Sequence, residues 1–286
     1  MTSSQDKSGG VAQIVAPSIS GTSADYVPPA DLLKSVTEAS QKKVALSPGK
    51  MLVRGFLSGA FLAFATAFAF KVSAGLPENV AALVSSLVFP VGFAMIVILS
   101  LELATGSFGV LPVGLAQRKI TLSGMLRNWG WVYVANFIGS LVCGFLIVIA
   151  LTEAFTHGPS ALGDKIIAVS ESKTLLYEQA GALGWLTAVV KGILCNWMVA
   201  FGTILGLSST SSIGKIASIW LPISTFFALG LEHSIVNMFL IPSAMMMGAD
   251  ISTTQWLVWN QIPVTLGNLI GGAFFTGLFF YWSSKE

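Results

Sequence analysis

Long apolar segments separated by short polar ones run through most of the chain. Crossing the ~30 Å hydrocarbon core of a bilayer takes about 20 apolar residues in a helix. The pattern therefore predicts six membrane-spanning helices, at 51–70, 80–116, 126–151, 182–207, 216–247 and 256–282. The second and fifth segments are too long for one straight crossing, and both contain glycine and proline. We expect these two spans to be interrupted.

The first fifty residues have a different pattern. Residues 1–28 are rich in Ser, Gly and Thr without periodicity, which predicts a disordered cytoplasmic tail. Residues 29–50 begin with Pro29 and Asp31 and space Leu32, Val36 and Ala39 as one apolar helix face. This favours an amphipathic N-terminal helix on the membrane surface over a longer tail. We expect residues 51–283 to form one transmembrane domain.

Composition agrees with a polytopic membrane protein. The chain is 54% hydrophobic and only 10% charged, whereas soluble domains carry about 25% charged residues. Cys143 and Cys195 both lie in apolar segments and are expected to be packing residues. The spacing of His and Cys predicts no metal site or cofactor. We expect no nucleic-acid partner and a bilayer environment.

The distribution of basic residues predicts the orientation. With six spans, eleven of the fifteen Lys and Arg residues fall on the side that carries both termini. Cytoplasmic loops are enriched in Lys and Arg, so both termini should be cytoplasmic and the loop 152–181 outside. The expected location is the plasma membrane or an inner membrane.

Two interrupted spans contain the candidate chemistry. Glu232 and His233 are the only ionisable residues between 216 and 247, and a charge at membrane depth costs about 2.5–3.5 kcal/mol on insertion scales. The same Leu-Glu pair recurs at Leu101-Glu102. Two matching polar breaks predict a transport site. The alternative is that His233 is a hydrogen-bonded core residue.

The two halves of the chain match at an offset of about 130 residues. Leu101-Glu102 matches Leu231-Glu232, and Asn136 matches Asn268. Three spans per repeat is an odd number, so we predict an all-α fold with an inverted 3+3 repeat. Arg54 and Lys191 are equivalent at an offset of 137. They are expected at opposite mouths, where one cation each would attract anions, unless they only anchor helix ends.

Several motifs closely resemble the formate/nitrite transporter family over residues 29–283. They are Glu102-Leu103-Ala104-Thr105-Gly106, Gly192-Ile193-Leu194-Cys195-Asn196-Trp197, Gly230-Leu231-Glu232-His233-Ser234-Ile235-Val236-Asn237-Met238 and Ile262-Pro263-Val264-Thr265-Leu266-Gly267-Asn268. The resemblance implies an aquaporin-like protomer with its own pore, assembled as a homopentamer. It also implies that the interrupted spans break into loops at the centre of that pore.

The resemblance implies roles for individual positions. His233 is the central histidine and Thr105 faces it, while Asn196 and Asn268 match asparagines along the substrate pathway. The apolar constrictions fall at Phe89, Phe93, Leu103 and Phe226. Phe93 departs from a smaller aliphatic residue in some formate channels, so the width of its constriction is open.

The chemistry of such a pathway sets the functional hypothesis. An anion that loses its hydration in an apolar constriction needs fixed hydrogen-bond donors, and His233, Thr105, Asn196 and Asn268 have donor groups. We predict passage of small monovalent anions, nitrite and/or formate, either with a proton relayed by His233 or as the bare anion. Glu102 and Glu232 are expected to be structural acids that accept N–H groups of the loops beside them.

Other functions stay open at this point. Bicarbonate, hydrosulfide, acetate and lactate suit the same kind of pore. A facilitator for neutral solutes is the next alternative, although the chain lacks the two Asn-Pro-Ala boxes of an aquaporin. An intramembrane metalloprotease would need a second histidine near His233, and His157 is distant in the sequence. We therefore expect a transport protein and not an enzyme.

Overall fold

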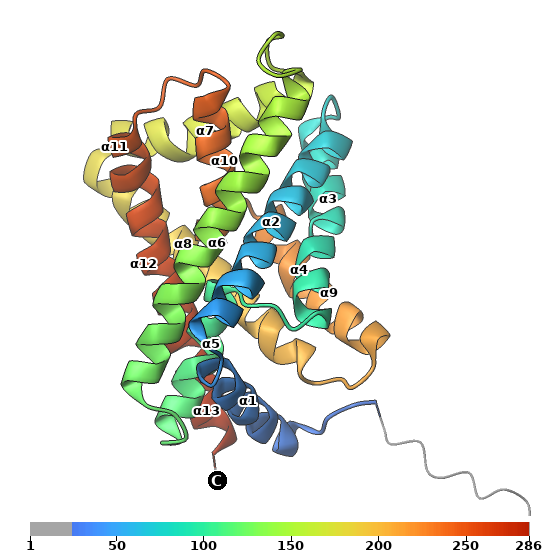
Figure 1. Ribbon diagram of the computed structural model, residues 1–286, viewed down its shortest axis with the longest axis vertical. Helices are drawn as coiled ribbons and strands as arrows, with labels where there is room; N and C mark the ends of the chain where they lie inside the picture. The colour runs from blue at the N-terminus through green and yellow to red at the C-terminus, as the bar shows by residue number, and fades with distance from the viewer. Residues whose placement is uncertain (1–24, 286) are drawn as a thin grey trace, which may run out of the picture.

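A computed structural model describes residues 25–285, and in that part of the chain the protein is almost entirely helical (Figure 1). The helices are α1 (Pro29–Val44), α2 (Pro48–Ser73), α3 (Glu78–Val88), α4 (Pro90–Ile98), α5 (Ala104–Ala116), α6 (Leu122–Leu151), α7 (Ala161–Gln179), α8 (Gly181–Gly206), α9 (Ser212–Ala228), α10 (Ser234–Met246), α11 (Thr253–Trp256), the π-helical η1 (Leu257–Gln261), α12 (Ile262–Ile270), the π-helical η2 (Gly271–Leu278) and α13 (Phe279–Ser284).

The apolar helices coincide with the apolar segments of the sequence. Within the described residues, five helices are long and apolar enough to cross a membrane: α2, α3 continued by α4, α6, α8, and the run from Thr253 to Ser284. The fifth segment instead forms two shorter apolar helices, α9 and α10, and α5 completes the second segment. Both long segments are thus interrupted, as predicted.

The interruptions lie at loops 99–103 and 229–233. Ser100 and Gly230 adopt the left-handed backbone region, with φ of 52° and 59°, just after α4 and α9 end. Pro112 and Pro242 lie inside α5 and α10, so the prolines do not make the breaks. The left-handed region favours glycine, and Ser100 occupies it without that freedom.

The ends of the molecule carry the amphipathic helices. Figure 1 shows α1 and α13 at one end and α7 with α11 at the other. The stretch 152–181, which we had treated as a loop, contains the 19-residue helix α7, with Ile166 and Tyr177 buried. Its mixed polar and apolar sequence lacks the long apolar run from which the membrane spans were predicted.

Only part of the expected tail can be compared with the structure, because residues 1–24 lie outside the described part. Residues 25–28 do not continue a structureless tail. The Val27 N–H donates to the Ser208 carbonyl at 2.8 Å, and the Thr210 N–H donates to the Asp25 carbonyl at 2.9 Å. This short pairing ties the start of α1 to the connection between α8 and α9.

Glycines allow the long helices to cross at backbone contact. On α6, a Cβ at Gly139 would collide with the Phe56 carbonyl of α2, and on η2 a Cβ at Gly271 would collide with the Ile193 carbonyl of α8. Small residues at such crossings bring two helix backbones together in a membrane. The close crossings hold α2 against α6 and α8 against α12 and η2, and so fix the frame around the two interruptions.

Candidate functional site

The site forms where two half-length helices begin inside the protein. The residues from Ala104 to Gly114 of α5 and from Ser234 to Ala244 of α10 are all buried. Leu103 and His233, which precede these helices, have extended backbones. The first N–H groups of a helix lack intrahelical partners, so both starts need acceptors from elsewhere.

Two buried asparagines supply these acceptors. The Asn136 Oδ1 accepts the Ala104 N–H at 2.9 Å, and the Asn268 Oδ1 accepts the Ser234 N–H at 2.8 Å. The Asn268 side-chain NH2 donates to the carbonyls of Gly192 and Glu232, both at 2.9 Å. Each asparagine therefore joins a half-helix, its preceding loop and a neighbouring long helix.

This geometry corrects the expected role of two residues. We expected Asn196 and Asn268 to donate to a passing anion, but both NH2 groups bind backbone carbonyls instead. Asn196 donates to Thr105 at 3.1 Å and to Asn268 at 2.6 Å. In a buried site the backbone carbonyls of the interrupted helices must be paired, and these amides pair them. We reassign Asn196 and Asn268 as residues that hold the loops.

His233 and Thr105 meet between the two half-helices. The Val236 N–H donates to the His233 Nδ1 at 3.2 Å, and the Nε2 lies 3.1 Å from the Thr105 Oγ1. Because Nδ1 accepts a hydrogen bond, the neutral ring carries its hydrogen on Nε2, which donates to Thr105. The threonine hydroxyl hydrogen is then left for another acceptor. The side chains of both residues are buried, at 2% and 0% exposure.

The start of α5 adds backbone donors beside this pair. Among the described residues, the N–H groups of Thr105 and Gly106 have no hydrogen-bond partner. A helix N-terminus carries a partial positive charge and suits an anion. The site thus combines an imidazole, a hydroxyl and two amides, all of which donate.

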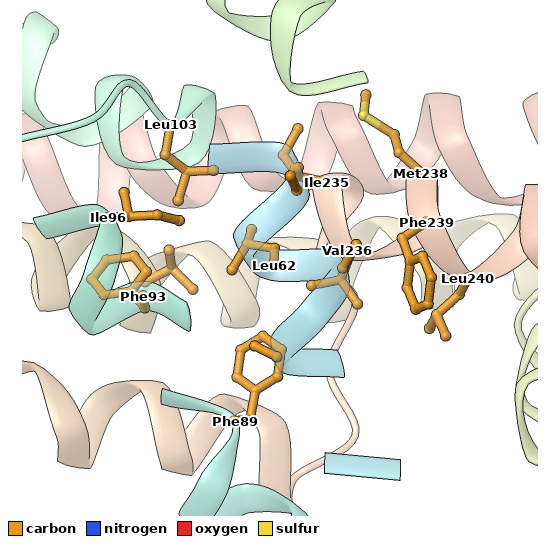
Figure 2. Packing of buried hydrophobic residues seen from close by; sticks show 14 of the residues in the cluster. Leu62, Phe89, Phe93, Ile96, Leu103, Ile235, Val236, Met238, Phe239 and Leu240 are labelled. Carbon is orange, nitrogen blue, oxygen red and sulfur yellow. The ribbon is translucent and has the colours of Figure 1, made fainter. Parts of the chain in front are cut away.

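Apolar residues surround the donor site, and the four expected constriction residues are among them. Phe89, Phe93, Leu103 and Phe226 are 1–3% exposed and belong to one apolar cluster. The ring of Phe226 stacks on the His233 ring with centroids 5.7 Å apart, and it meets Phe89 edge-on at 5.6 Å. Figure 2 shows Leu103 above Phe93, and Phe89 below both.

Known proteins are similar to this chain in sequence and in fold. The family model described as "Formate/nitrite transporter" matches residues 30–282. A probable formate transporter of Methanothermobacter thermautotrophicus is 36% identical over 271 residues, which cover 90% of this chain and 97% of the relative. The formate channel BtFdhC of Bacillus thuringiensis is 34% identical, with 88% and 94% covered.

Two solved structures are also similar. One, described as an FNT family ion channel, has a TM-score of 0.78 at 23% identity, covering 89% of this chain and 99% of its own. Another, described as a pentameric formate channel with formate bound, has a TM-score of 0.68 at 28% identity, covering 82% and 97%.

The chain belongs to the formate/nitrite transporter family. The family resemblance of the sequence motifs is therefore confirmed, and the protein is an integral membrane protein of a channel and transporter family. The all-α fold of the described residues agrees with the structures of other family members.

This family member holds its two buried acids in ion pairs. The Lys43 Nζ of α1 lies 3.1 Å from the Glu102 carboxylate, and the Lys173 Nζ of α7 lies 2.9 Å from that of Glu232. The acids are 3% and 1% exposed. A buried carboxylate without a partner is strongly unfavourable, so helices at both ends of the molecule each insert a lysine.

Side-chain amides complete both acid sites. The Asn128 Nδ2 donates to Glu102 at 3.2 Å. Glu232 accepts the Tyr177 hydroxyl at 2.8 Å and the Asn237 Nδ2 at 2.7 Å. We had expected Glu102 and Glu232 to accept loop N–H groups, and this was wrong: at the half-helix starts the asparagine amides accept those groups.

The two lysines were missed in the sequence, although a signal was present. Lys43 precedes Glu102 by 59 residues, and Lys173 precedes Glu232 by the same number. The repeat therefore extends into α1 and α7. We had searched for it only within the apolar segments, where neither lysine lies.

The two expected vestibule cations lie beside the interruptions. The Arg54 guanidinium is 3.5 Å from the Ser100 carbonyl. The Lys191 ammonium lies over the Tyr177 ring, 5.8 Å from its centroid, and its backbone carbonyl accepts the Glu232 N–H at 3.5 Å. Both are half-buried. Each is thus in position to influence the loop that precedes a half-helix.

Proposed function

We propose that the protein conducts small monovalent anions, formate and/or nitrite, through the site between α5 and α10. The observation that carries the proposal is the buried contact between His233 and Thr105 at the start of a half-helix. With the neutral ring donating from Nε2 to Thr105, the hydrogen left over at this contact is that of the Thr105 hydroxyl, which suits an anion and disfavours a cation. The family relatives named for formate support the substrate class.

The proposed pathway has apolar constrictions on both sides of the donor site. Phe89 and Phe226 form one, and Phe93 and Leu103 form the other. Rings and aliphatic side chains exclude bulk water, and a partly dehydrated anion then exchanges its lost hydration for the Thr105 hydroxyl and the N–H groups of α5. Arg54 and Lys191 raise the local anion concentration at the two mouths in this scheme.

The neutral form of His233 is the donor in this proposal. A second proton on Nδ1 would face the Val236 N–H, which already donates there, so the cap of α10 would break. We infer that the imidazole acts through Nε2 as a fixed donor. Coupled proton movement through His233 would require this cap to open and close with each anion.

We further propose six spans in an inverted 3+3 repeat with both termini cytoplasmic. The six spans are α2, the two interrupted pairs α3/α4–α5 and α9–α10, α6, α8, and the segment from α11 to α13. The hydrogen bond of Asn136 to the start of α5 is equivalent to that of Asn268 to the start of α10. The ion pair of Lys43 is equivalent to that of Lys173. Both equivalences support the repeat. We keep an amphipathic N-terminal helix before the transmembrane domain, which begins with α2 at Pro48. Assembly as a homopentamer follows the similar pentameric channel.

Flux measurements test the proposal. The fluxes of formate, nitrite, bicarbonate, hydrosulfide, acetate, lactate, glycerol and ammonia are compared in one preparation of purified protein in liposomes. Formate and nitrite should pass. Selective flux of a neutral solute without anion flux would overturn it in favour of a facilitator. Uptake limited to one of the other anions would keep the pore and replace its substrate.

A further inference from the structure

Lys165 on α7 forms a second polar site, away from the central one. Its ammonium donates to the Ser73 Oγ at the end of α2 at 2.7 Å. It also lies over the Phe70 ring, 5.3 Å from the centroid. Ser73 is fixed in turn, because its hydroxyl donates to the Ala69 carbonyl at 2.7 Å. The lysine head group is thus held in one place and does not sweep the surface.

This held ammonium has no carboxylate partner in the described part of the chain. The three ion pairs found there involve Lys43, His157 and Lys173 and do not include Lys165. Burial lowers the pKa of the Lys165 ammonium from its usual value. An ammonium has three donors. One binds Ser73 and one side faces a ring, so donor capacity remains for an anion.

Aromatic rings connect this ammonium to the central histidine. Phe70 lies 6.4 Å from Phe227, and Phe227 stacks on Phe89 at 4.1 Å. Phe89 then meets Phe226, which stacks on the His233 ring at 5.7 Å. These successive contacts lead from the Lys165 ammonium at the α7 end of the protein to the donor site between α5 and α10.

We propose that Lys165 and Ser73 form an anion-binding subsite that receives small carboxylates and oxyanions at the α7 end before they enter the aromatic constriction. This inference rests on the proposed function and adds a specific first binding site to it. Among residues 25–285, the position equivalent to Lys165 by the repeat does not form such a subsite. The equivalent position on α1, 130 residues earlier, is Ser35, whose hydroxyl donates to the Asp31 carbonyl of its own helix. The two ends of the pathway should therefore saturate at different anion concentrations.

The test compares half-saturating concentrations of formate applied at the α7 end. Vesicles are sorted by sidedness through a tag on the C-terminus, which lies at the opposite end (Figure 1). Lys165→Met keeps the aliphatic stem over Phe70 and removes the charge. A hydrogen bond to a charged group contributes about 1.5–3 kcal/mol, so the half-saturating concentration should rise roughly tenfold or more with an unchanged maximal rate. Lys165→Arg should restore it to within about twofold.

Lys71→Met is the matched control. Lys71 lies on α2 two residues before Ser73 and is exposed. Its replacement by Met therefore removes the same charge from the same end of the protein. Its half-saturating concentration should change by less than about twofold, since screening weakens exposed charges. Equal shifts in Lys71→Met and Lys165→Met would reduce the effect to general surface charge and overturn the subsite. An unchanged value in Lys165→Met would overturn it too.

A measurement on the intact pathway covers the case in which Lys165→Met does not assemble. Lysines are labelled with ¹³C at Cε, which leaves the charge and all three N–H donors intact, and the Lys165 resonance is assigned by its loss in Lys165→Arg. Formate should shift this resonance in a saturable way and leave that of Lys71 in place. No shift of the Lys165 resonance, in protein that does conduct formate, overturns the subsite and leaves the proposed function standing. Absence of any formate flux in the wild type overturns the proposed function itself.

Discussion

Removing the lysine partner of Glu232 should destabilise the protein strongly. In Lys173→Met the Glu232 carboxylate would remain buried, at 1% exposure, without the ammonium that lies 2.9 Å away. Breaking a buried ion pair by removing one partner costs about 3–5 kcal/mol. The hydroxyl of Tyr177 and the amide of Asn237 stay in place, which favours the lower part of that range.

The cost can be measured as a loss of thermal stability of the purified protein. A change of 1 kcal/mol shifts the melting temperature of a chain of 150–250 residues by about 2–4 °C, so Lys173→Met should melt roughly 6–20 °C lower. The double variant Lys173→Met/Glu232→Gln removes the stranded charge but keeps an amide that can accept from Asn237. It should recover most of the loss.

The double variant decides whether the explanation is right. If Lys173 acts through the charge of Glu232, the two substitutions cannot add, because each alone breaks the same pair. Additive losses in the double variant would refute the ion-pair account and point to packing of the lysine stem. The equivalent substitution Lys43→Met, on α1, should behave in the same way toward Glu102.

Five further substitutions, in three tests, probe separate parts of the structure. Gly230→Ala should destabilise the protein by about 1 kcal/mol through its left-handed φ alone, since a Cβ there meets nothing within 4 Å. Ser100→Gly should stabilise the protein by a similar amount, because it relieves the same backbone conformation. Thermal melts measure both effects. Gly139→Ala should prevent close packing of α6 on α2 and lower the yield of folded protein. Gly130→Ala is the control and should be neutral, because a Cβ at Gly130 meets open space. Equal yields of the two variants would contradict the close crossing. Thr105→Val should reduce formate flux at least tenfold, because it removes the hydroxyl donor and keeps the shape, and it should cost about 1–3 kcal/mol of stability, because the buried His233 Nε2–H loses its acceptor.

The apolar spans were predictable because each is a long run of apolar residues, which is a strong local signal. Twenty apolar residues exclude most other structures, and so the segments could be placed to within a few residues. The interruptions were visible from the polar Glu102 and Glu232. The helix α7 was not, because nine of its nineteen residues are Asp, Glu, Lys, Ser, Thr or Gln, and its apolar positions alone do not distinguish a helix from a polar loop.

The contacts of the site were harder to predict than its residues. His233 and Thr105 were named from the sequence, and they meet at 3.1 Å. The sequence does not say which donors are consumed by the backbone, and Asn268 illustrates this. An asparagine near a pathway suggests a ligand donor, but the Asn268 side chain is already bonded to three backbone groups, in α10, in the loop before it and in α8. Lys173 was missed because its partner lies 59 residues away, in the loop before α10.

The initial rate of formate uptake through His233→Phe tests the central claim most directly. The substitution keeps a ring against Phe226 and removes both the Nε2 donor and the acceptor for the Val236 N–H. His233→Asn is the companion variant, because its side chain can accept that N–H and donate toward Thr105. With both variants shown to be folded and inserted, the account predicts that flux falls roughly ten- to a hundredfold in His233→Phe and falls less in His233→Asn. Wild-type flux through His233→Phe would contradict the claim that the anion passes by the donors of this site.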